Sequence, residues 1–417
     1  MLDPVMWVLY SIVLFISLFL LITWFDEEER IRPVTETREE LPSISLIIPA
    51  YNEEETIAMT IDSALDIDYP RDKYDIIVVN DGSTDSTLEE ARKFKENENV
   101  TIIDKENGGK GSALNAGVRE SDSELVACVD ADSILKEDSL KHMVSEIGDE
   151  YAGVASAMKV YKPQNLLQKL QWVEYIVGIF TRNIMGLMNA IHVTPGPLSV
   201  YRREKLLKVG LFDEDSLVED QEICFRLQEN HEKIGHATPA EVYTVAPSTW
   251  AEFKNQRYRW YRGSLETAIQ YKNMIFNREY GDFGMFALPG KLAQTFLSLV
   301  VLFVTVYMLG QPIFEFLVEF SKIGLQIFSL DPLTPAMVID KIYWSLISIR
   351  FTSFFFIAAM FGTSVVMALM ASRHTEENLL KHGILPVLLY LFFFVFINGV
   401  IWLRVIIRMI MSTERTW

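Results

Sequence analysis

Short apolar runs alternate with helical patterns between residues 44 and 160. Four of these runs predict strands, because each is rich in β-branched residues and ends in polar ones: ISLIIPAY, YDIIVVND, VTIID and ELVACVDAD. Each is followed by a stretch of helical periodicity, such as EEETIAMTIDSALD or DSTLEEARKFKE. Strands that alternate with helices predict a parallel sheet with helices on both faces. The expected fold class is therefore α/β.

Four longer stretches carry no charged residue and are long enough to cross a bilayer. They are residues 5–25, 292–314, 351–372 and 383–403. As helices, each would span about 30 Å, the thickness of a hydrocarbon core. The first has no basic segment before it and no small-residue cleavage site after it, so it predicts an anchor rather than a cleaved signal peptide.

These patterns divide the chain into three expected parts. They are an N-terminal transmembrane anchor over residues 1–30, a cytoplasmic α/β domain over 31–280 and a C-terminal transmembrane region over 281–417. The C-terminal region is expected to cross the membrane near residues 292–314, 344–372 and 383–403. Two segments of the middle part, near residues 165–190 and 248–274, have the apolar periodicity of amphipathic helices. These helices could pack in the core of the domain. The favoured interpretation is that they lie at the membrane interface.

Composition supports this hybrid organisation. Of the 417 residues, 50% are hydrophobic, and the net charge of −18 is concentrated in residues 26–290. An acidic domain argues against nucleic acid as a partner and against broad attraction to anionic lipid. Cys128 and Cys224 lie far apart in apolar contexts, which predicts neither a disulfide nor a metal site. A reducing, cytoplasmic environment fits them best.

Acidic residues stand where two of the predicted strands end. Asp81 belongs to NDGSTDS, and Asp130 and Asp132 belong to VDAD. Ligands bind at this edge of such sheets. At an extended strand end Asp130 and Asp132 would point to one side and repel each other unless a cation joined them, and Mg²⁺ or Mn²⁺ suits such oxygen ligands. Taken alone, so short a triplet favours a solvated loop, and Asp-Gly-Ser is ordinary turn chemistry.

Two further segments combine charge with a helix start. In KENGGKGSALNAG the glycines expose backbone N–H groups, and a helix beginning near Ser112 would place its positive end close to Lys110. This suits an anionic substrate, although sheet geometry alone could require the glycines. In LVEDQEICFRLQ, Glu219 and Asp220 begin another helix, where acids either complement the helix dipole or supply a general base.

The segment Trp250–Tyr261 predicts a helix with a distinctive face. Gln256, Arg259 and Trp260 stand at positions i, i+3 and i+4, so an amide, a guanidinium and an indole share one side. Such a side offers donors for an anionic group beside a flat surface that stacks on a sugar ring. An amphipathic helix lying on a membrane would also carry Trp and Arg.

In chain order, seven segments resemble the motif series of the membrane-embedded, processive family 2 glycosyltransferases: IIPAYNEEETI, VVNDGSTD, NGGKGSALN, VDAD, GPLSVYRR, VED and QRYRW. This group includes hyaluronan, chitin, cellulose and poly-N-acetylglucosamine synthases. The resemblance covers roughly residues 44–261. It implies a GT-A (Rossmann-like) catalytic domain, a UDP-sugar donor, Mg²⁺ or Mn²⁺ as cofactor, and inversion at the anomeric carbon.

The resemblance also implies roles for individual residues. Those expected to contact the nucleotide sugar are Tyr51, Glu53, Asp81, Lys110 and Asp130, and Asp132 would hold the metal. Asp220 would be the base that takes the proton of the acceptor hydroxyl, with Glu219 beside it in the substrate site. Gln256 and Arg259 would steady the diphosphate, and Trp260 would stack beneath the acceptor sugar.

The expected function is transfer of a sugar from a UDP-sugar to the hydroxyl end of a growing polysaccharide, coupled to its translocation across the cell membrane. Two alternatives remain: a non-processive transferase acting on a lipid carrier such as a polyprenyl phosphate, and a non-catalytic nucleotide-sugar sensor. Val218 stands where the family usually has Thr. The F-x-V-T-x-K gating sequence of cellulose synthases is absent from the chain, which disfavours cellulose.

Topology is open at the C-terminal end. If the α/β domain is cytoplasmic, four spans place the C-terminus outside, whereas Arg404, Arg408 and Arg415 favour the inside. Either residues 313–330 insert as a further span, or the terminal segment bends back along the interface.

Overall fold

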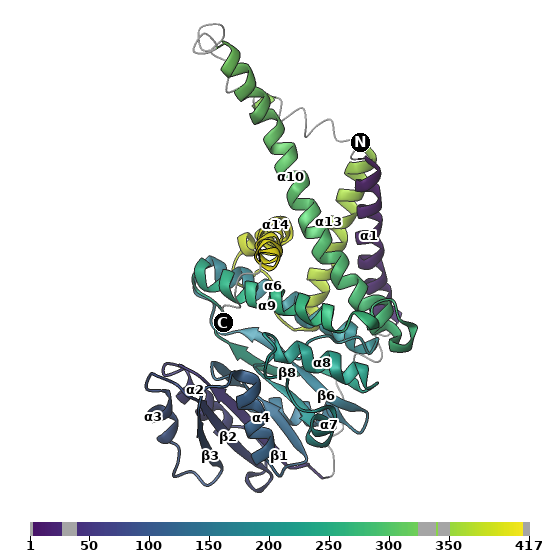
Figure 1. Cartoon of the computed structure of the whole chain (residues 1–417). Helices are drawn as coiled ribbons and strands as arrows, with labels where there is room; N and C mark the ends of the chain where they lie inside the picture. The colour runs from purple at the N-terminus through teal and green to yellow at the C-terminus, as the bar shows by residue number, and fades with distance from the viewer. Residues whose placement is uncertain (1–2, 27–39, 324–338, 341–350, 412–417) are drawn as a thin grey trace.

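The computed structural model of the protein describes residues 3–26, 40–323, 339–340 and 351–411. A sheet domain forms one end of the molecule, long helices form the other, and two helices lie between them (Figure 1). The expected segments 27–30, 324–330 and 344–350, and Arg415, lie outside the described residues.

One mixed sheet has the strand order β3-β2-β1-β4-β7-β6-β8-β5. Its strands are β1 (Ile44–Ala50), β2 (Tyr74–Asp81), β3 (Val100–Lys105), β4 (Leu125–Cys128), β5 (Ser133–Leu135), β6 (Tyr151–Val160), β7 (Ser199–Arg202) and β8 (Lys233–Thr244). Strands β1 to β4 pair in parallel, as do β6 and β8. Strand β7 is antiparallel to both β4 and β6, and β5 is antiparallel to β8. The α/β class is confirmed, and the four predicted strands pair in parallel with one another. The antiparallel strands β5 and β7, which were not among those four, make the sheet mixed.

The second half of the sheet carries a weak local signal. Strand β6 has the sequence YAGVASAMKV, which is rich in alanine and poor in β-branched residues. Strand β8 has the sequence KIGHATPAEVYT, in which a glycine and a proline interrupt the apolar pattern. They pair along almost their whole length, and most of β6 is buried. Burial and pairing with a distant strand, rather than intrinsic propensity, therefore make these segments strands.

Helices cover both faces of the sheet because the side chains of β1 alternate between two cores. Leu46 and Ile48 pack into one core with α2 (Ile57–Leu65) and α5 (Ser139–Ile147). Ile47 packs into the other with α4 (Lys110–Glu120), so closely that a Cβ on Gly117 would lie 2.4 Å from its side chain. The smaller helices are α3 (Thr87–Arg92), α7 (Arg203–Val209) and α8 (Glu219–Glu229).

The two intermediate helices are α6 (Leu166–Leu187) and α9 (Trp250–Gln270). Each begins with a capping box, formed by Asn165 and Gln168 for α6 and by Thr249 and Glu252 for α9, which satisfies the first N–H groups of the helix. Both lie between the sheet and the long helices (Figure 1).

The long helices are α1 (Asp3–Asp26), α10 (Leu288–Ile323), α13 (Phe351–His374) and α14 (Ile384–Ile410). Single turns at Arg71–Lys73, Lys272–Met274 and Arg278–Tyr280 and a π-helical turn at Phe283–Ala287 complete the helical segments. Within the described part of the chain, Phe283–Tyr307 and Ile384–Ile410 are long and apolar enough to cross a membrane.

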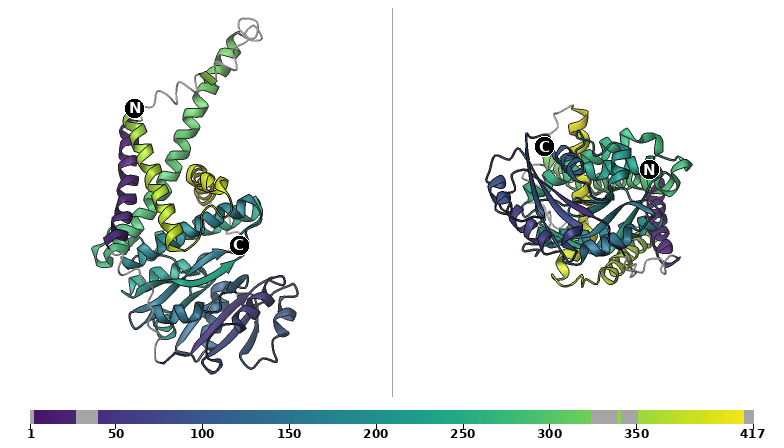
Figure 2. Two further views of the ribbon diagram at one scale, coloured as in Figure 1. Left: turned by 180° about the vertical axis from the view of Figure 1, so that it is seen from behind. Right: turned by 90° about the horizontal axis from the view of Figure 1, so that it is seen from below.

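Helix α14 lies across the other long helices. Helices α1, α10 and α13 run away from the sheet domain, whereas α14 is seen nearly end-on in the same view and lengthwise from below (Figures 1 and 2). It packs on α9, where the Tyr261 and Trp402 rings stack at 4.6 Å and the Tyr261 hydroxyl donates to Asn398 Oδ1 at 2.7 Å. The C-terminal part of α14 is thus held against the helices that border the sheet domain.

Candidate active site

A cavity of about 390 Å³ lies between the carboxyl ends of the central strands and the helices above them. Eight of the residues singled out in the sequence line it: Lys110, Asp130, Asp132, Glu219, Asp220, Gln256, Arg259 and Trp260. Tyr51, Glu53 and Asp81 do not line it and lie at the ends of β1 and β2. The fold thus gathers residues that are up to 150 positions apart in the chain into one site.

Lys110, the first residue of α4, joins two of the acidic segments. Its ammonium lies 2.6 Å from Asp130 Oδ1 and 2.8 Å from Glu219 Oε1. Burial alone would lower the pKa of Lys110, but these two carboxylates raise it. Burial would likewise raise the pKa of Glu219, yet the attraction of Lys110 and Arg259 lowers it. Lys110 therefore stays charged, and it fixes the end of β4 against the start of α8.

The loop at Thr194–Pro197 binds both acidic segments. The Asp130 N–H donates to Gly196 O at 3.2 Å, and the Thr194 N–H and hydroxyl donate to Asp220 O at 3.4 and 3.2 Å. A Cβ at Gly196 would lie 2.5 Å from Asp130 Oδ2 and 2.7 Å from Lys110 Nζ. Any side chain at this position would therefore force the ion pair between Asp130 and Lys110 to shift.

We expect Gly196→Ala to lower kcat/KM by about 10²-fold, because the added methyl group pushes Asp130 and Lys110 out of position at the reacting centre. The matched control is Gly290→Ala, since a Cβ there meets no atom within 4 Å. Steady-state kinetics of the two purified variants would check this. Equal activity of both would contradict the role of Gly196.

Asp130 and Asp132 do not extend a strand, contrary to the sequence-based expectation. Strand β4 ends at Cys128, and the two residues lie in a turn that the Ser133 N–H closes by donating to Asp130 O at 3.0 Å. The Thr60 hydroxyl also donates to Ala131 O at 2.8 Å, which pulls the middle residue of the turn into the core. The turn nevertheless presents both carboxylates to the cavity.

The surroundings of Asp132 suit a divalent cation. Burial and the nearby carboxylates of Asp130 and Glu53 raise the pKa of Asp132 to about 7. Among the described residues Asp132 has no ion-pair partner, so a bound cation would relieve this repulsion. The described part of the chain contains no group of three or more His, Cys, Asp or Glu side chains that could hold a metal by themselves. Further ligands would therefore be waters, backbone carbonyl groups or a substrate.

The carboxylate of Asp81 is hydrogen-bonded to the end of β3 and to the loop that follows it. Its carboxylate accepts from Lys105 Nζ at 2.6 Å and from the Gly108 and Gly109 N–H groups at 3.0 and 2.8 Å. Gly109 needs its positive φ of 86° for this turn. Tyr51 is about half exposed, and Glu53 accepts from the Thr56 hydroxyl at 2.6 Å. The proposed contacts of these residues with a nucleotide stay predictions.

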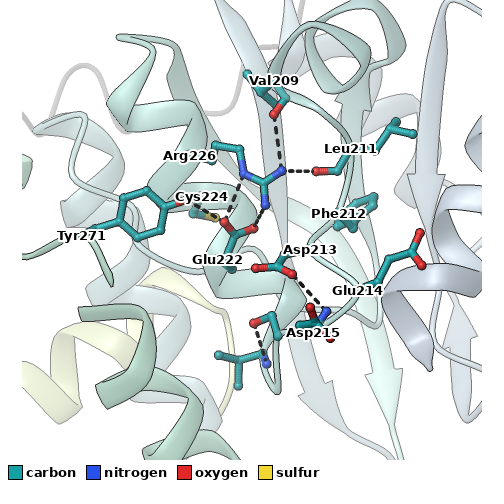
Figure 3. Close-up of polar contacts among 12 residues, drawn as sticks. Val209, Leu211, Phe212, Asp213, Glu214, Asp215, Glu222, Cys224, Arg226 and Tyr271 are labelled. Carbon is teal, nitrogen blue, oxygen red and sulfur yellow. Dashed lines mark hydrogen bonds and ion pairs between the residues drawn. The ribbon is translucent and has the colours of Figure 1, made fainter. Parts of the chain in front are cut away.

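The acidic residues at the start of α8 divide between the cavity and the core. Glu219 and Asp220 line the cavity, whereas Glu222 is buried and accepts from Arg226 and from the Tyr271 hydroxyl (Figure 3). Arg226 also donates to Leu211 O at 2.7 Å, which ties α8 to the preceding loop. Glu222 therefore anchors the helix that presents Asp220.

Asp220 has the properties of a general base. Burial and the adjacent Glu219 raise its pKa to about 6, and Lys110 partly offsets this shift. A carboxylate with a raised pKa accepts a proton more readily and is still ionised at neutral pH.

The face predicted on α9 lines the same cavity. Gln256 lies one helical turn before the consecutive residues Arg259 and Trp260, as the spacing indicated, and all three line the cavity. The guanidinium of the buried Arg257 stacks over the Trp260 ring at 4.3 Å. Its two terminal nitrogens also donate to the carboxylate of Glu174 on α6 at 2.7 and 2.6 Å. This buried ion pair fixes the orientation of the indole.

Sequence reasoning missed the part of the cavity that the long helices form. Gln294, Thr295 and Ser298 of α10 and Asn398 and Trp402 of α14 line it, as do Lys291 and, from α6, Arg182. The polar residues after Lys291 recur at helical spacing, which indicates a polar face on this helix. A span that is defined only by its lack of charge does not reveal this face.

Comparisons with known proteins agree with this fold. Residues 45–210 match the family model described as glycosyl transferase family 2. A poly-β-1,6-N-acetyl-D-glucosamine synthase of Staphylococcus epidermidis is 29% identical over 278 residues, which cover 63% of this chain and 67% of the relative. The synthase of Staphylococcus aureus strain COL is 30% identical over 237 residues, covering 56% of this chain and 57% of the relative.

A solved structure shares the fold over nearly the whole chain. It is a mannosyltransferase from Pyrobaculum calidifontis in complex with GDP-mannose and Mn²⁺, with a TM-score of 0.56 and 17% identity, covering 97% of this chain and 100% of its own. Residues 45–210 are therefore a family 2 glycosyltransferase domain with a GT-A-like fold, and the chain is a homologue of the poly-β-1,6-N-acetyl-D-glucosamine synthases.

Proposed function

We propose that the protein is an inverting, processive polysaccharide synthase that uses a UDP-sugar. It transfers the sugar to the hydroxyl end of a growing polysaccharide and moves that polysaccharide across the membrane. The observation that carries this proposal is the single cavity lined by the Asp130–Asp132 turn, Asp220 and the Gln256, Arg259 and Trp260 face. The UDP-sugar, the general base and the aromatic ring that stacks on the acceptor sugar would lie together there.

The chemistry requires residues of these types. Asp132, with Asp130 beside it, would hold Mg²⁺ or Mn²⁺, which supplies positive charge for the leaving diphosphate when bound. Arg259 would add a donor for the same diphosphate, because its guanidinium has no ion-pair partner among the described residues. Asp220 would take the proton of the attacking hydroxyl. Attack from the face opposite the diphosphate inverts the anomeric carbon.

The path of the product is proposed from the continuation of the cavity. Beyond Trp260 it is bordered by the amides and hydroxyls of α10 and α14 and by the Trp402 ring. Polar groups beside flat aromatic rings suit a sugar chain. Residues of a membrane-spanning helix that face lipid are rarely polar, so these polar side chains fit the lining of a path better than a surface in contact with lipid.

A membrane arrangement follows from the orientation of α14. We place α1, α10 and α13 across the membrane, with the sheet domain in the cytoplasm and α14 along the interface. Arg408 lies 5.1 Å from the Tyr258 ring of α9, so the basic end of α14 is on the side of the sheet domain. This arrangement satisfies the preference of Arg404 and Arg408 for the cytoplasmic side.

The test uses the full chain in nanodiscs with Mn²⁺ or Mg²⁺ and a panel of labelled UDP-sugars, with the product sized by gel. We expect a high-molecular-weight product from one donor or donor pair, lost in Asp220→Asn and on removal of metal by EDTA. A single transfer to lipid would instead favour the transferase that uses a polyprenyl phosphate. Tight UDP binding without turnover would favour a sensor.

A further inference from the structure

The end of the cavity that faces the long helices is lined by hydrogen-bond donors from three elements. They are Arg182 of α6, Gln221 of α8 and Lys291 of α10. The fold brings them together next to Asp220, and the chemistry proposed above uses none of them.

Lys291 orients Gln221. Its ammonium donates to Gln221 Oε1 at 3.0 Å, and the Ser264 hydroxyl donates to the same oxygen. Since an ammonium can only donate, the amide oxygen must face Lys291, and the amide nitrogen points elsewhere. Gln221 is only 4% exposed, and its Nε2 has no hydrogen-bond partner in the described part of the chain. A buried donor without a partner is costly and indicates a missing acceptor.

Arg182 presents a second unpaired donor. Its Nε is buried without a hydrogen-bond partner, and no carboxylate of the described residues lies within ion-pair distance of its guanidinium. Arg182 and Lys291 lie in the same neighbourhood, because both add to burial in lowering the pKa of His192. A histidine carries no negative charge in either protonation state, so His192 cannot compensate their charges.

At this end of the cavity the basic side chains outnumber the carboxylates that face them. Lys110 is paired with Asp130 and Glu219, and Glu174 is paired with Arg257. Of the acidic residues lining the cavity, this leaves Asp132 for a metal and Asp220 as the base. Of the basic residues, Arg259 is left for the diphosphate, so Arg182 and Lys291 together face only Asp220. An anionic ligand at this end would compensate both cations and take up the Gln221 amide donor.

We infer that the acceptor is an acidic glycan, whose carboxylate or phosphate substituent binds Arg182, Lys291 and the amide nitrogen of Gln221. This inference rests on the proposed transfer to a growing glycan and specifies its chemical class. The adjoining Gln294, Thr295 and Asn398 suit sugar hydroxyls better than acyl chains.

The experiment compares two acceptors of equal length in nanodiscs: an oligosaccharide of N-acetylglucosamine, and one that alternates N-acetylglucosamine with glucuronic acid. We expect the acidic acceptor to have the lower KM. Lys291→Gln and Arg182→Gln should each raise that KM by about 10-fold or more, because each removes a hydrogen bond to a charged group. They should raise the KM of the neutral acceptor much less, and Lys291→Arg should retain most of the preference. Lys254→Gln, at an exposed position of α9, is the matched control.

Four outcomes would overturn the inference. If the Arg182 and Lys291 variants raised the KM of both acceptors equally, the two residues would have only a structural role. If polyprenyl phosphate served as acceptor where both oligosaccharides failed, the two cations would bind a lipid phosphate. UDP release is measured separately, without added acceptor. Release combined with equal use of the two oligosaccharides would reject only the acidic acceptor, whereas no release from any UDP-sugar would reject the proposed function as well.

Discussion

Asp220→Asn should lower kcat by about 10²–10⁴-fold, the usual contribution of a positioned general base. An amide cannot take the proton of the acceptor hydroxyl, but it fills the same space at the start of α8. The KM of the UDP-sugar should therefore change little. Initial rates of UDP release with a saturating acceptor would measure both parameters. Asp72→Asn, at an exposed position before β2, is the control.

The pH profile gives this prediction a signature that a structural defect would not produce. The base must be deprotonated to act, and burial with Glu219 raises the pKa of Asp220 to about 6. Activity should therefore rise with pH below about 6 and level off above it, and this acid limb should vanish in Asp220→Asn. Glu219→Gln should move the limb to lower pH, because it removes a neighbouring negative charge. An unchanged acid limb in Asp220→Asn would assign the base to another residue.

Glu174→Ala should destabilise the protein by about 3–5 kcal/mol, because it leaves the buried guanidinium of Arg257 without its partner. The double variant Glu174→Met with Arg257→Met should be less destabilised than Glu174→Ala, since it leaves no isolated charge. Thermal unfolding of the detergent-solubilised variants would compare them. Residual transferase activity should show a raised acceptor KM, because Arg257 no longer holds the Trp260 ring.

An exposed ion pair provides the comparison for this prediction. Lys233 and Glu150 are paired on the surface, and more than half of the Glu150 side chain is exposed. Glu150→Ala should therefore cost less than about 1 kcal/mol. If Glu174→Ala cost no more than that, the pair between α6 and α9 would not be important for stability.

Local patterns predicted the elements that carry their own signal. Strands β1 to β4 were found because apolar, β-branched runs end in polar residues. The runs match β1 to β3 within one residue, whereas β4 ends at Cys128, before the end of its run. The face of α9 was found because helical spacing alone decides which side chains share a side. Strands β6 and β8 were missed because β6 is rich in alanine and β8 contains a glycine and a proline, so both segments become strands through burial and pairing with each other.

The sequence by itself determined the glycosyltransferase class, the parallel half of the sheet and the residue types of the site, because motifs and periodicities are local properties of a chain. Only the tertiary structure decided that the Asp130–Asp132 segment is a turn, that Gly196 makes room for the Lys110 ion pair, and that α14 lies across the other helices. It also brought Arg182, Gln221 and Lys291 together beside Asp220. Such features depend on contacts between distant segments, and no local pattern encodes which buried donor is left without a partner.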